Sequence, residues 1–119
     1  MACAPYPRDA PMLDELRAEV EHQARRLAGH PCIALWGGNN EVEASLSWYP
    51  ASRANPALYA VDFQVTFVEA VRGVLQRLDP GRVFLDSSPS SGLLSAQPYV
   101  KRWGDAQVRR AGGQGGEGE

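Results

Sequence analysis

The sequence has few of the features that mark membrane proteins, nucleic-acid-binding proteins or disulfide-rich domains. Its formal net charge is −2, so nothing predicts attraction to nucleic acid or to an acidic membrane surface. No apolar run approaches the roughly 20 residues that a membrane helix needs. Two cysteines, Cys3 and Cys32, are too few for a disulfide framework. The N-terminus also lacks the charged and apolar regions of a signal peptide. We therefore expect no nucleic acid, no membrane and no defined protein partner.

Metal, nucleotide and serine-hydrolase motifs are missing as well. His22 and His30 lie eight residues apart on different turns, and no cysteine or carboxylate pattern joins them, so solvated or capping histidines explain both better than a zinc site. Neither a GxxxxGK[ST] run nor a GxGxxG that opens a helix is present. Ser87 and Ser88 have no nearby Asp-His pair that would make either a nucleophile. We expect no metal and no cofactor.

Two helices are predicted from the spacing of apolar residues. Asp9 can cap the first helix, with Pro11 tolerated in its first turn, and Gly29 ends it. Its apolar positions recur at intervals of three and four, at Leu13, Leu16, Val20, Ala24 and Leu27. The second helix covers residues 57–78 and stops at Asp79. Each helix therefore has one apolar face that packs on the rest of the fold.

Two short apolar runs, residues 32–37 and 82–86, are predicted strands buried on both faces. The order helix, strand, loop, helix, strand indicates an α/β fold with parallel strands. Two strands that open onto polar loops about 50 residues apart suit a (β/α)8 TIM barrel. Because a whole barrel takes roughly 250 residues, the chain would hold about two to three βα units. The fold class is thus α/β, a partial TIM barrel.

The stretch from Cys32 to Glu41 organises this prediction. It begins as an apolar strand, turns at Gly37 and Gly38, which allow backbone angles that residues with a Cβ resist, and ends in two amides and a carboxylate. Polar side chains at the end of a buried strand must be hydrogen-bonded or take part in chemistry. Active sites of parallel α/β folds lie at the carboxyl ends of strands. Glu41 is therefore the first candidate for a catalytic residue.

The segment from His30 to Glu41 resembles the acid/base segment of the β-mannosidases of glycoside hydrolase family two. Matching flanks occur at residues 2–7 and at Ser87-Ser88-Pro89, and the resemblance fades near residue 105. It implies two regions: residues 1–105 are part of a glycoside hydrolase catalytic barrel, and residues 106–119 are a glycine-rich tail. We expect the tail to be disordered, because it is almost devoid of core residues.

The resemblance implies a retaining hydrolase of terminal β-linked mannose in oligosaccharides, with Glu41 as general acid/base. Asn40 matches the residue that binds the sugar 2-hydroxyl, and Asn39 and Trp36 belong to the same motif as substrate-binding candidates. The family's nucleophile is a later glutamate beyond the region of resemblance, and no carboxylate after Glu41 replaces it here. The parent enzyme of this resemblance is lysosomal.

Two questions stay open at this point. Residues 42–58 form a loop longer than usual, in which Trp48 and Tyr49 either stack on sugar rings or pack beneath the loop. The chain is either a working part of such an enzyme or a catalytically inactive truncated product or interaction fragment. A related glycosidase of the same clan, a β-galactosidase or β-glucuronidase, is a third reading.

Overall fold

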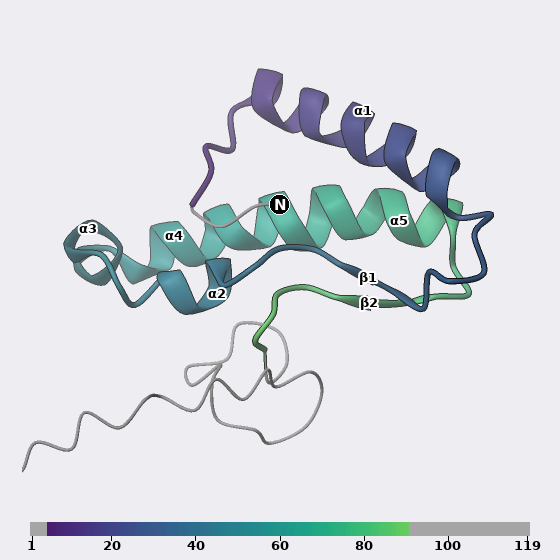
Figure 1. Cartoon of the computed structure of the whole chain (residues 1–119). Helices are drawn as coiled ribbons and strands as arrows, with labels where there is room; N and C mark the ends of the chain where they lie inside the picture. Colours follow the sequence, from purple (N-terminus) through teal and green to yellow (C-terminus); the bar gives the residue numbers. More distant parts are fainter. Residues whose placement is uncertain (1–4, 91–119) are drawn as a thin grey trace, which may run out of the picture.

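The computed structural model describes residues 5–90, which form a two-stranded parallel sheet with helices packed on one of its faces (Figure 1). The predicted tail at residues 106–119 and its boundary at residue 105 lie outside the described residues. Within the described part, no helix is long and apolar enough to cross a membrane.

The first helix, α1 (Ala10–Leu27), forms where the apolar spacing predicts it. Asp9 caps it, since the Asp9 carboxylate accepts a hydrogen bond of 3.0 Å from the backbone N–H of Met12. Arg25 and Arg26 occupy its last turn, where cations favour the helix dipole. The helix packs against η1 and α5, described below, and this contact buries Ala24.

Strands β1 (Leu35–Gly37) and β2 (Val83–Leu85) pair in parallel, as predicted. Leu35 pairs with Val83 and Gly37 with Leu85, an offset of 83 − 35 = 48 residues. An isolated parallel bridge between Asn40 and Ser88 keeps the same offset (88 − 40 = 48) beyond the strand ends. The segments that follow the two strands therefore stay in register, residue for residue.

The helix predicted over residues 57–78 is one long rod built from three parts, namely α4 (Pro56–Phe63), η1 (Gln64–Val71) and α5 (Arg72–Leu78) (Figure 1). The middle part, η1, is π-helical, which the apolar spacing did not reveal because both helix types bury one face. Two short helices, α2 (Val42–Ser45) and α3 (Pro50–Ala54), occupy the segment that was predicted to be a loop.

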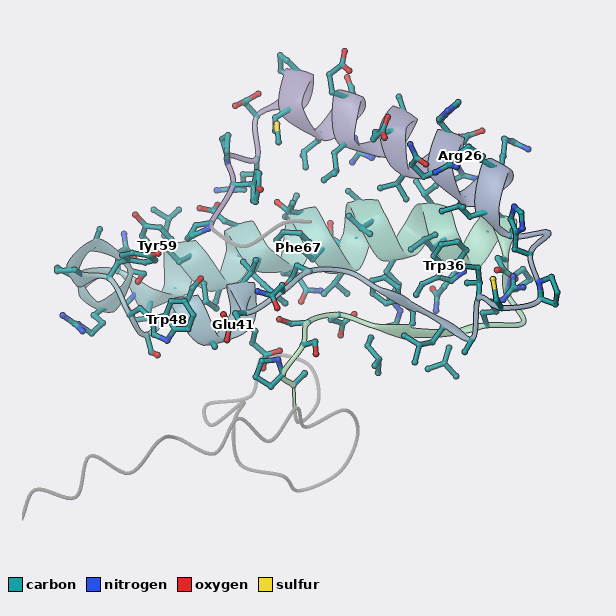
Figure 2. The ribbon with its side chains drawn as sticks, in the orientation of Figure 1. Arg26, Trp36, Glu41, Trp48, Tyr59 and Phe67 are labelled. Atoms are coloured by element: carbon teal, nitrogen blue, oxygen red, sulfur yellow. The ribbon has the colours of Figure 1, made fainter. Side chains whose placement is uncertain are left out.

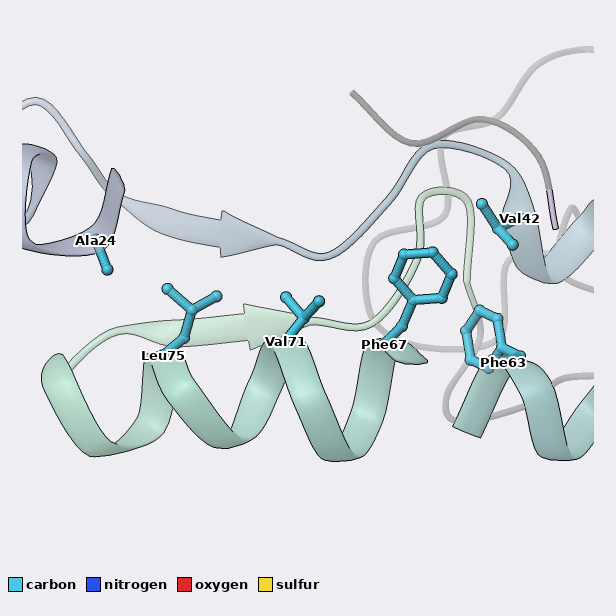
Figure 3. Close-up of a cluster of buried hydrophobic side chains, with 6 residues drawn as sticks. All are labelled: Ala24, Val42, Phe63, Phe67, Val71 and Leu75. Atoms are coloured by element: carbon cyan, nitrogen blue, oxygen red, sulfur yellow. The ribbon is translucent and has the colours of Figure 1, made fainter. Parts of the chain in front are cut away.

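The core lies between the long helix, α1 and one face of the strands (Figure 3). Its buried members are Ala24, Val42, Phe63, Phe67, Val71 and Leu75. Trp36 and Phe84, from the middles of the two strands, pack against this cluster.

The opposite face of the strand pair is open. Leu35 is 46% exposed and Val83 is 62% exposed, so the prediction of strands buried on both faces is wrong for these residues. The physical reason is that, within residues 5–90, the helices cover only the face that carries Trp36 and Phe84.

Candidate active site

Glu41 lies directly beyond β1, where α2 begins, and it is only 9% exposed. Its backbone is left-handed, with φ 59° and ψ 8°, and it is the single non-glycine residue with positive φ in the described part of the chain. Such a conformation is unfavourable for a residue with a Cβ and persists only where the surroundings enforce it. The turn therefore holds its carboxylate-bearing residue in a strained conformation.

Gly37 and Gly38 precede Glu41 in the turn. Neither has a positive φ, so the turn does not use the backbone freedom that glycine allows there. Gly38 is needed for a close approach, because a Cβ there would lie 2.5 Å from the carbonyl oxygen of Asp86. A Cβ on Gly37 would meet nothing within 4 Å. Gly38 thus lets the ends of β1 and β2 come together, and its N–H donates to the Leu85 carbonyl at 2.8 Å.

Asn39 connects the two strand ends through its side-chain amide. Its Nδ2 donates to the carbonyl oxygen of Asp86 at 2.7 Å. Its Oδ1 accepts two hydrogen bonds, from the Ser87 hydroxyl at 2.6 Å and from the Val42 backbone N–H at 3.1 Å. Asn39 is 6% exposed and Ser87 is 1% exposed. The amide of Asn39 is therefore used inside the fold, next to Glu41.

Backbone hydrogen bonds between residues 39–41 and Ser88 also connect the segments that follow β1 and β2, and we call this meeting point of the two strand ends the junction. The N–H of Glu41 donates to the carbonyl of Ser88 at 2.9 Å, and the N–H of Ser88 donates to the carbonyl of Asn39 at 3.1 Å. Asn40, half-buried, lies between these two contacts. The loop after β2 thus holds the peptide units on both sides of Asn40.

Trp36, in the middle of β1, lies apart from Glu41 (Figure 2). Its indole Nε1–H donates to Asp79 Oδ2 at 2.8 Å, and Asp79 ends α5. Of the four residues predicted for the site, the structure thus brings Asn39, Asn40 and Glu41 together and leaves Trp36 among the core side chains.

A hollow of about 490 Å³ lies between the segment that precedes α1 and the helices α3 and α4. Three tyrosines line it, together with small residues and one carboxylate, and its lining is Pro5, Tyr6, Pro7, Tyr49, Ala51, Ser52, Tyr59 and Asp62. The Trp48 ring stands edge-on to that of Tyr49, with centroids 6.5 Å apart, and is not part of the lining. Tyr49 is 45% exposed, so it does not pack beneath the loop as the alternative interpretation expected.

Two further carboxylates come close to the strand ends. Glu43 is 3% exposed and accepts a hydrogen bond of 3.0 Å from the Ser90 hydroxyl. Asp86 follows β2, and burial raises the pKa of its carboxyl, partly offset by Arg72, whose Nη1 lies 4.0 Å from Asp86 Oδ1. Within residues 5–90, no group of three His, Cys, Asp or Glu side chains is placed to hold a metal ion.

Sequence reasoning treated Ser87 as an ordinary loop residue and missed its place in the junction. Asn39 and Ser87 are each the second residue after an observed strand end, at Gly37 and Leu85, whereas the predicted second strand ran one residue further, to Asp86. In a parallel pair, residues at equal distances from the paired strand ends lie side by side. The pairing of Asn39 with Ser87 therefore needed the exact end of the second strand.

The chain is similar to β-mannosidases from animals. It is 40% identical over 113 residues to the beta-mannosidase of Bos taurus, in a match that covers 87% of this chain and 13% of that protein. With the same coverage it is 35% identical to the beta-mannosidase of Mus musculus. A protein named probable beta-mannosidase from Caenorhabditis elegans is 29% identical over 87% of this chain and 12% of its own length. No protein-family profile matches the chain.

These matches cover most of the chain but a small part of each relative. The chain spans about 13% of the length of the curated relatives from Bos taurus and Capra hircus. By its sequence the chain therefore belongs to the β-mannosidase family, of which it represents a fragment.

Proposed function

We propose that the chain is the part of a β-mannosidase that supplies the general acid/base, Glu41. The observation that carries the proposal is that a nearly buried glutamate is held in a left-handed turn at the carboxyl end of a parallel strand. Strand ends of this kind are where parallel α/β enzymes place catalytic groups. The substrate class is the β-mannoside, and the resemblance assigns the parent enzyme to the lysosome.

The fold of the parent follows from the open face of the strand pair. Leu35 and Val83 present apolar side chains on the face opposite the helices. In a (β/α)8 barrel that face points inward and is covered by side chains of the other strands. We therefore interpret residues 5–90 as two strands of such a barrel with the helices of their units, and the remaining strands as the natural cover of this face.

In the retaining mechanism, Glu41 would protonate the leaving oxygen and later take a proton from the attacking water. Asn40 would bind the sugar 2-hydroxyl beside it. A second carboxylate, about 5–5.5 Å from the first in retaining enzymes, would attack the anomeric carbon. We assign that nucleophile to the part of the enzyme that follows this segment, because Glu43 and Asp86 are held in other contacts.

The structure supports different roles for the other two predicted site residues. The Asn39 amide has all three of its observed partners inside the fold, so we assign it to the support of Glu41 rather than to sugar contact. Trp36 packs with the core and bonds to Asp79, so we assign it to the stability of the unit. Tyr49 is the better candidate for a sugar contact, since flat rings complement pyranose faces and the hollow beside it is open.

The test is hydrolysis of a chromogenic β-mannoside by two proteins. One is the purified chain. The other is a chimera in which this chain replaces the matching segment of the Bos taurus protein. We expect the chimera to hydrolyse the substrate and its Glu41→Gln variant to lose about 10²- to 10⁴-fold in rate, the usual contribution of a general acid/base. The chain alone should be inactive for want of a nucleophile.

Activity of the chain alone, lost in Glu41→Gln, would show that a second carboxylate is present and refute our assignment of the nucleophile. A folded chimera that is inactive would favour the alternative of a catalytically inactive product. Preference for a β-galactoside or a β-glucuronide over the β-mannoside would favour the related glycosidases.

A further inference from the structure

Ser87 belongs to a different βα unit from Glu41, yet its side chain reaches the turn that holds this residue. Its hydroxyl donates to Asn39 Oδ1 at 2.6 Å and lies 3.4 Å from the backbone N–H of Glu43, from which it accepts. Ser87 therefore touches the residue two positions before Glu41 and the residue two positions after it. No catalytic role requires a serine at this place, and its burial makes it more than an ordinary loop residue.

The orientation of the Asn39 amide is fixed by its partners. The Asp86 carbonyl can only accept a hydrogen bond, so the NH₂ group must face it. The backbone N–H of Val42 can only donate, so Oδ1 must face Val42. The Ser87 hydroxyl then has to donate to that same oxygen, which leaves its own oxygen free to accept from Glu43. One serine thus completes a network in which each polar group has a partner of the right kind.

Glu41 depends on this network because its own conformation is unfavourable. A left-handed backbone is unfavourable for a residue with a Cβ, and surrounding contacts must offset that cost. The flanking contacts at Val42 and Glu43 pass through Asn39 and Ser87. Without the hydroxyl, Asn39 Oδ1 keeps one donor instead of two, and the buried N–H of Glu43 loses its acceptor. The turn should then relax toward ordinary helical angles.

We propose that Ser87, acting through Asn39, is a positioning residue that holds Glu41 in its left-handed turn for proton transfer. The proposal deepens the proposed function, on which its catalytic part rests. Its structural part, the dependence of the Glu41 conformation on the Ser87 hydroxyl, stands on the geometry alone.

The first experiment measures that conformation by NMR in the whole chain. A strong nuclear Overhauser effect between the amide proton and Hα of Glu41 reports a positive φ, and amide exchange at Val42 reports the bond to Asn39. In Ser87→Ala we expect the effect to weaken and exchange at Val42 to become about tenfold faster, as the loss of one buried hydrogen bond predicts. Ser87→Thr, which keeps the hydroxyl, should restore both signals.

Thr66→Val is the matched control, because Thr66 is 1% exposed and its Oγ1 has no hydrogen-bond partner in the structure. It removes an equally buried hydroxyl and should leave the Glu41 signals unchanged. Should Ser87→Ala unfold the chain, Ser87→Cys replaces the hydroxyl with a weaker donor of similar size and should give a smaller shift in the same direction. Unchanged Glu41 signals in a folded Ser87→Ala or Ser87→Cys chain would overturn the proposal, as would equal changes in Thr66→Val.

The second experiment tests the catalytic part in the chimera with two leaving groups. A dinitrophenyl β-mannoside needs little protonation of its leaving oxygen, whereas a methyl β-mannoside needs full protonation. We expect Ser87→Ala to lower kcat/KM about tenfold for the methyl substrate and to leave kcat/KM for the dinitrophenyl substrate nearly unchanged, because kcat/KM reports the step in which the leaving group departs. Equal losses for both would indicate a merely structural role and contradict the proposal.

The two experiments distinguish failure of the proposed function from failure of the positioning proposal. An unsubstituted chimera that is inactive, or that keeps its activity in Glu41→Gln, would refute the proposed function, and the NMR measurement would still decide whether Ser87 holds the turn. An active chimera with unchanged leaving-group dependence would refute positioning alone.

Discussion

The two ends of the β1–β2 pair are tied together by different chemistry. At the amino end, Arg82 donates from Nε to the Ile33 carbonyl at 2.7 Å and forms an ion pair with Asp79, which also accepts from Trp36. At the carboxyl end, the neutral side chains of Asn39 and Ser87 make the connection. Charged side chains connect the amino ends of the strands, where the backbone is unstrained. At the carboxyl ends, a buried amide network surrounds the turn of Glu41, whose backbone is strained.

The two kinds of connection, an ion pair and a buried amide network, suit different roles. An ion pair that is partly exposed tolerates small shifts, and at the amino ends of barrel strands such contacts serve stability. A buried amide with three short hydrogen bonds tolerates little displacement, because each lost partner leaves a buried polar group unsatisfied. The proposed general acid, Glu41, needs precise placement, and the hydrogen bonds of Asn39 at the carboxyl end restrict the turn that carries it.

The largest expected effect comes from replacing Glu41, where activity and stability should change in opposite directions. Replacing it with glycine removes the carboxylate and also relieves the left-handed backbone. In the chimera, Glu41→Gly should lose about 10²- to 10⁴-fold in rate on poorly activated β-mannosides. In the chain, its free energy of unfolding in urea should rise by about 1 kcal/mol.

Glu41→Gln is the matched variant for this prediction. It removes the carboxylate and keeps the Cβ, so it should lose activity without the gain in stability. A glycine variant that is less stable than the glutamine variant would show that the turn is not strained, and would remove one side of the comparison between the two ends.

The second effect tests the close approach at the carboxyl end. In Gly38→Ala the new methyl group would lie 2.5 Å from the Asp86 carbonyl oxygen, a backbone atom that cannot rotate away. We expect a loss of up to about 3 kcal/mol in the free energy of unfolding, at the upper end of the cost of overpacking. Gly37→Ala, one residue earlier, meets nothing within 4 Å and should change stability by less than about 0.5 kcal/mol. Equal losses in urea titrations of the two variants would contradict the assigned approach.

The third effect concerns the contacts of Arg82 that connect the amino ends of β1 and β2. Arg82→Ala removes the ion pair with Asp79 and the hydrogen bonds to the carbonyls of Ile33 and His30. The side chain is 21% exposed, and we expect a loss of about 2 kcal/mol in the free energy of unfolding. Arg77→Ala removes an ion pair between side chains that are 62% and 38% exposed and should cost less than about 0.5 kcal/mol.

Kinetic measurements on Arg82→Ala test whether the amino ends of the strands also affect catalysis. Arg82→Ala should lower the rate on methyl and dinitrophenyl β-mannosides by the same factor, if at all, because it does not touch the turn at Glu41. A loss confined to the methyl substrate would mean that the amino end also positions the general acid, and the division of roles would be wrong.

The sequence predicted the parts of this unit whose cause is local. The apolar spacing of α1, the cap at Asp9 and the parallel order of the strands are all repeated in the structure. What it did not predict depends on contacts between distant residues. The left-handed Glu41, the close approach at Gly38 and the pairing of Asn39 with Ser87 each arise where two strand ends meet. The exposure of Leu35 and Val83 arises because the helices of residues 5–90 cover only the other face of the strand pair.

The smallest expected effect is a difference in pH dependence between Asp79 at the amino end and Asp86 at the carboxyl end. Hydrogen bonds from Arg82 and then from Trp36 lower the pKa of Asp79 below its ordinary value of 3.8. Burial raises the pKa of Asp86 above the same value, partly offset by the charge of Arg72. Ionisation therefore favours the folded state at Asp79 and disfavours it at Asp86.

The signs lead to opposite results for two matched variants. Asp79 contributes stability above pH 3.8, and that contribution is lost as the pH falls through its lowered pKa. Asp86 reduces stability as the pH rises from 3.8 through its raised pKa, and the penalty vanishes below that range. At neutral pH, Asp79→Asn should thus be less stable than the parent chain and Asp86→Asn more stable. Urea midpoints measured from pH 7 down to pH 3 should show both differences shrinking once the carboxyl groups are protonated. Differences of the same sign would mean that the two ends share one electrostatic character, since only a buried, poorly paired carboxylate at the carboxyl end makes its amide variant the more stable protein.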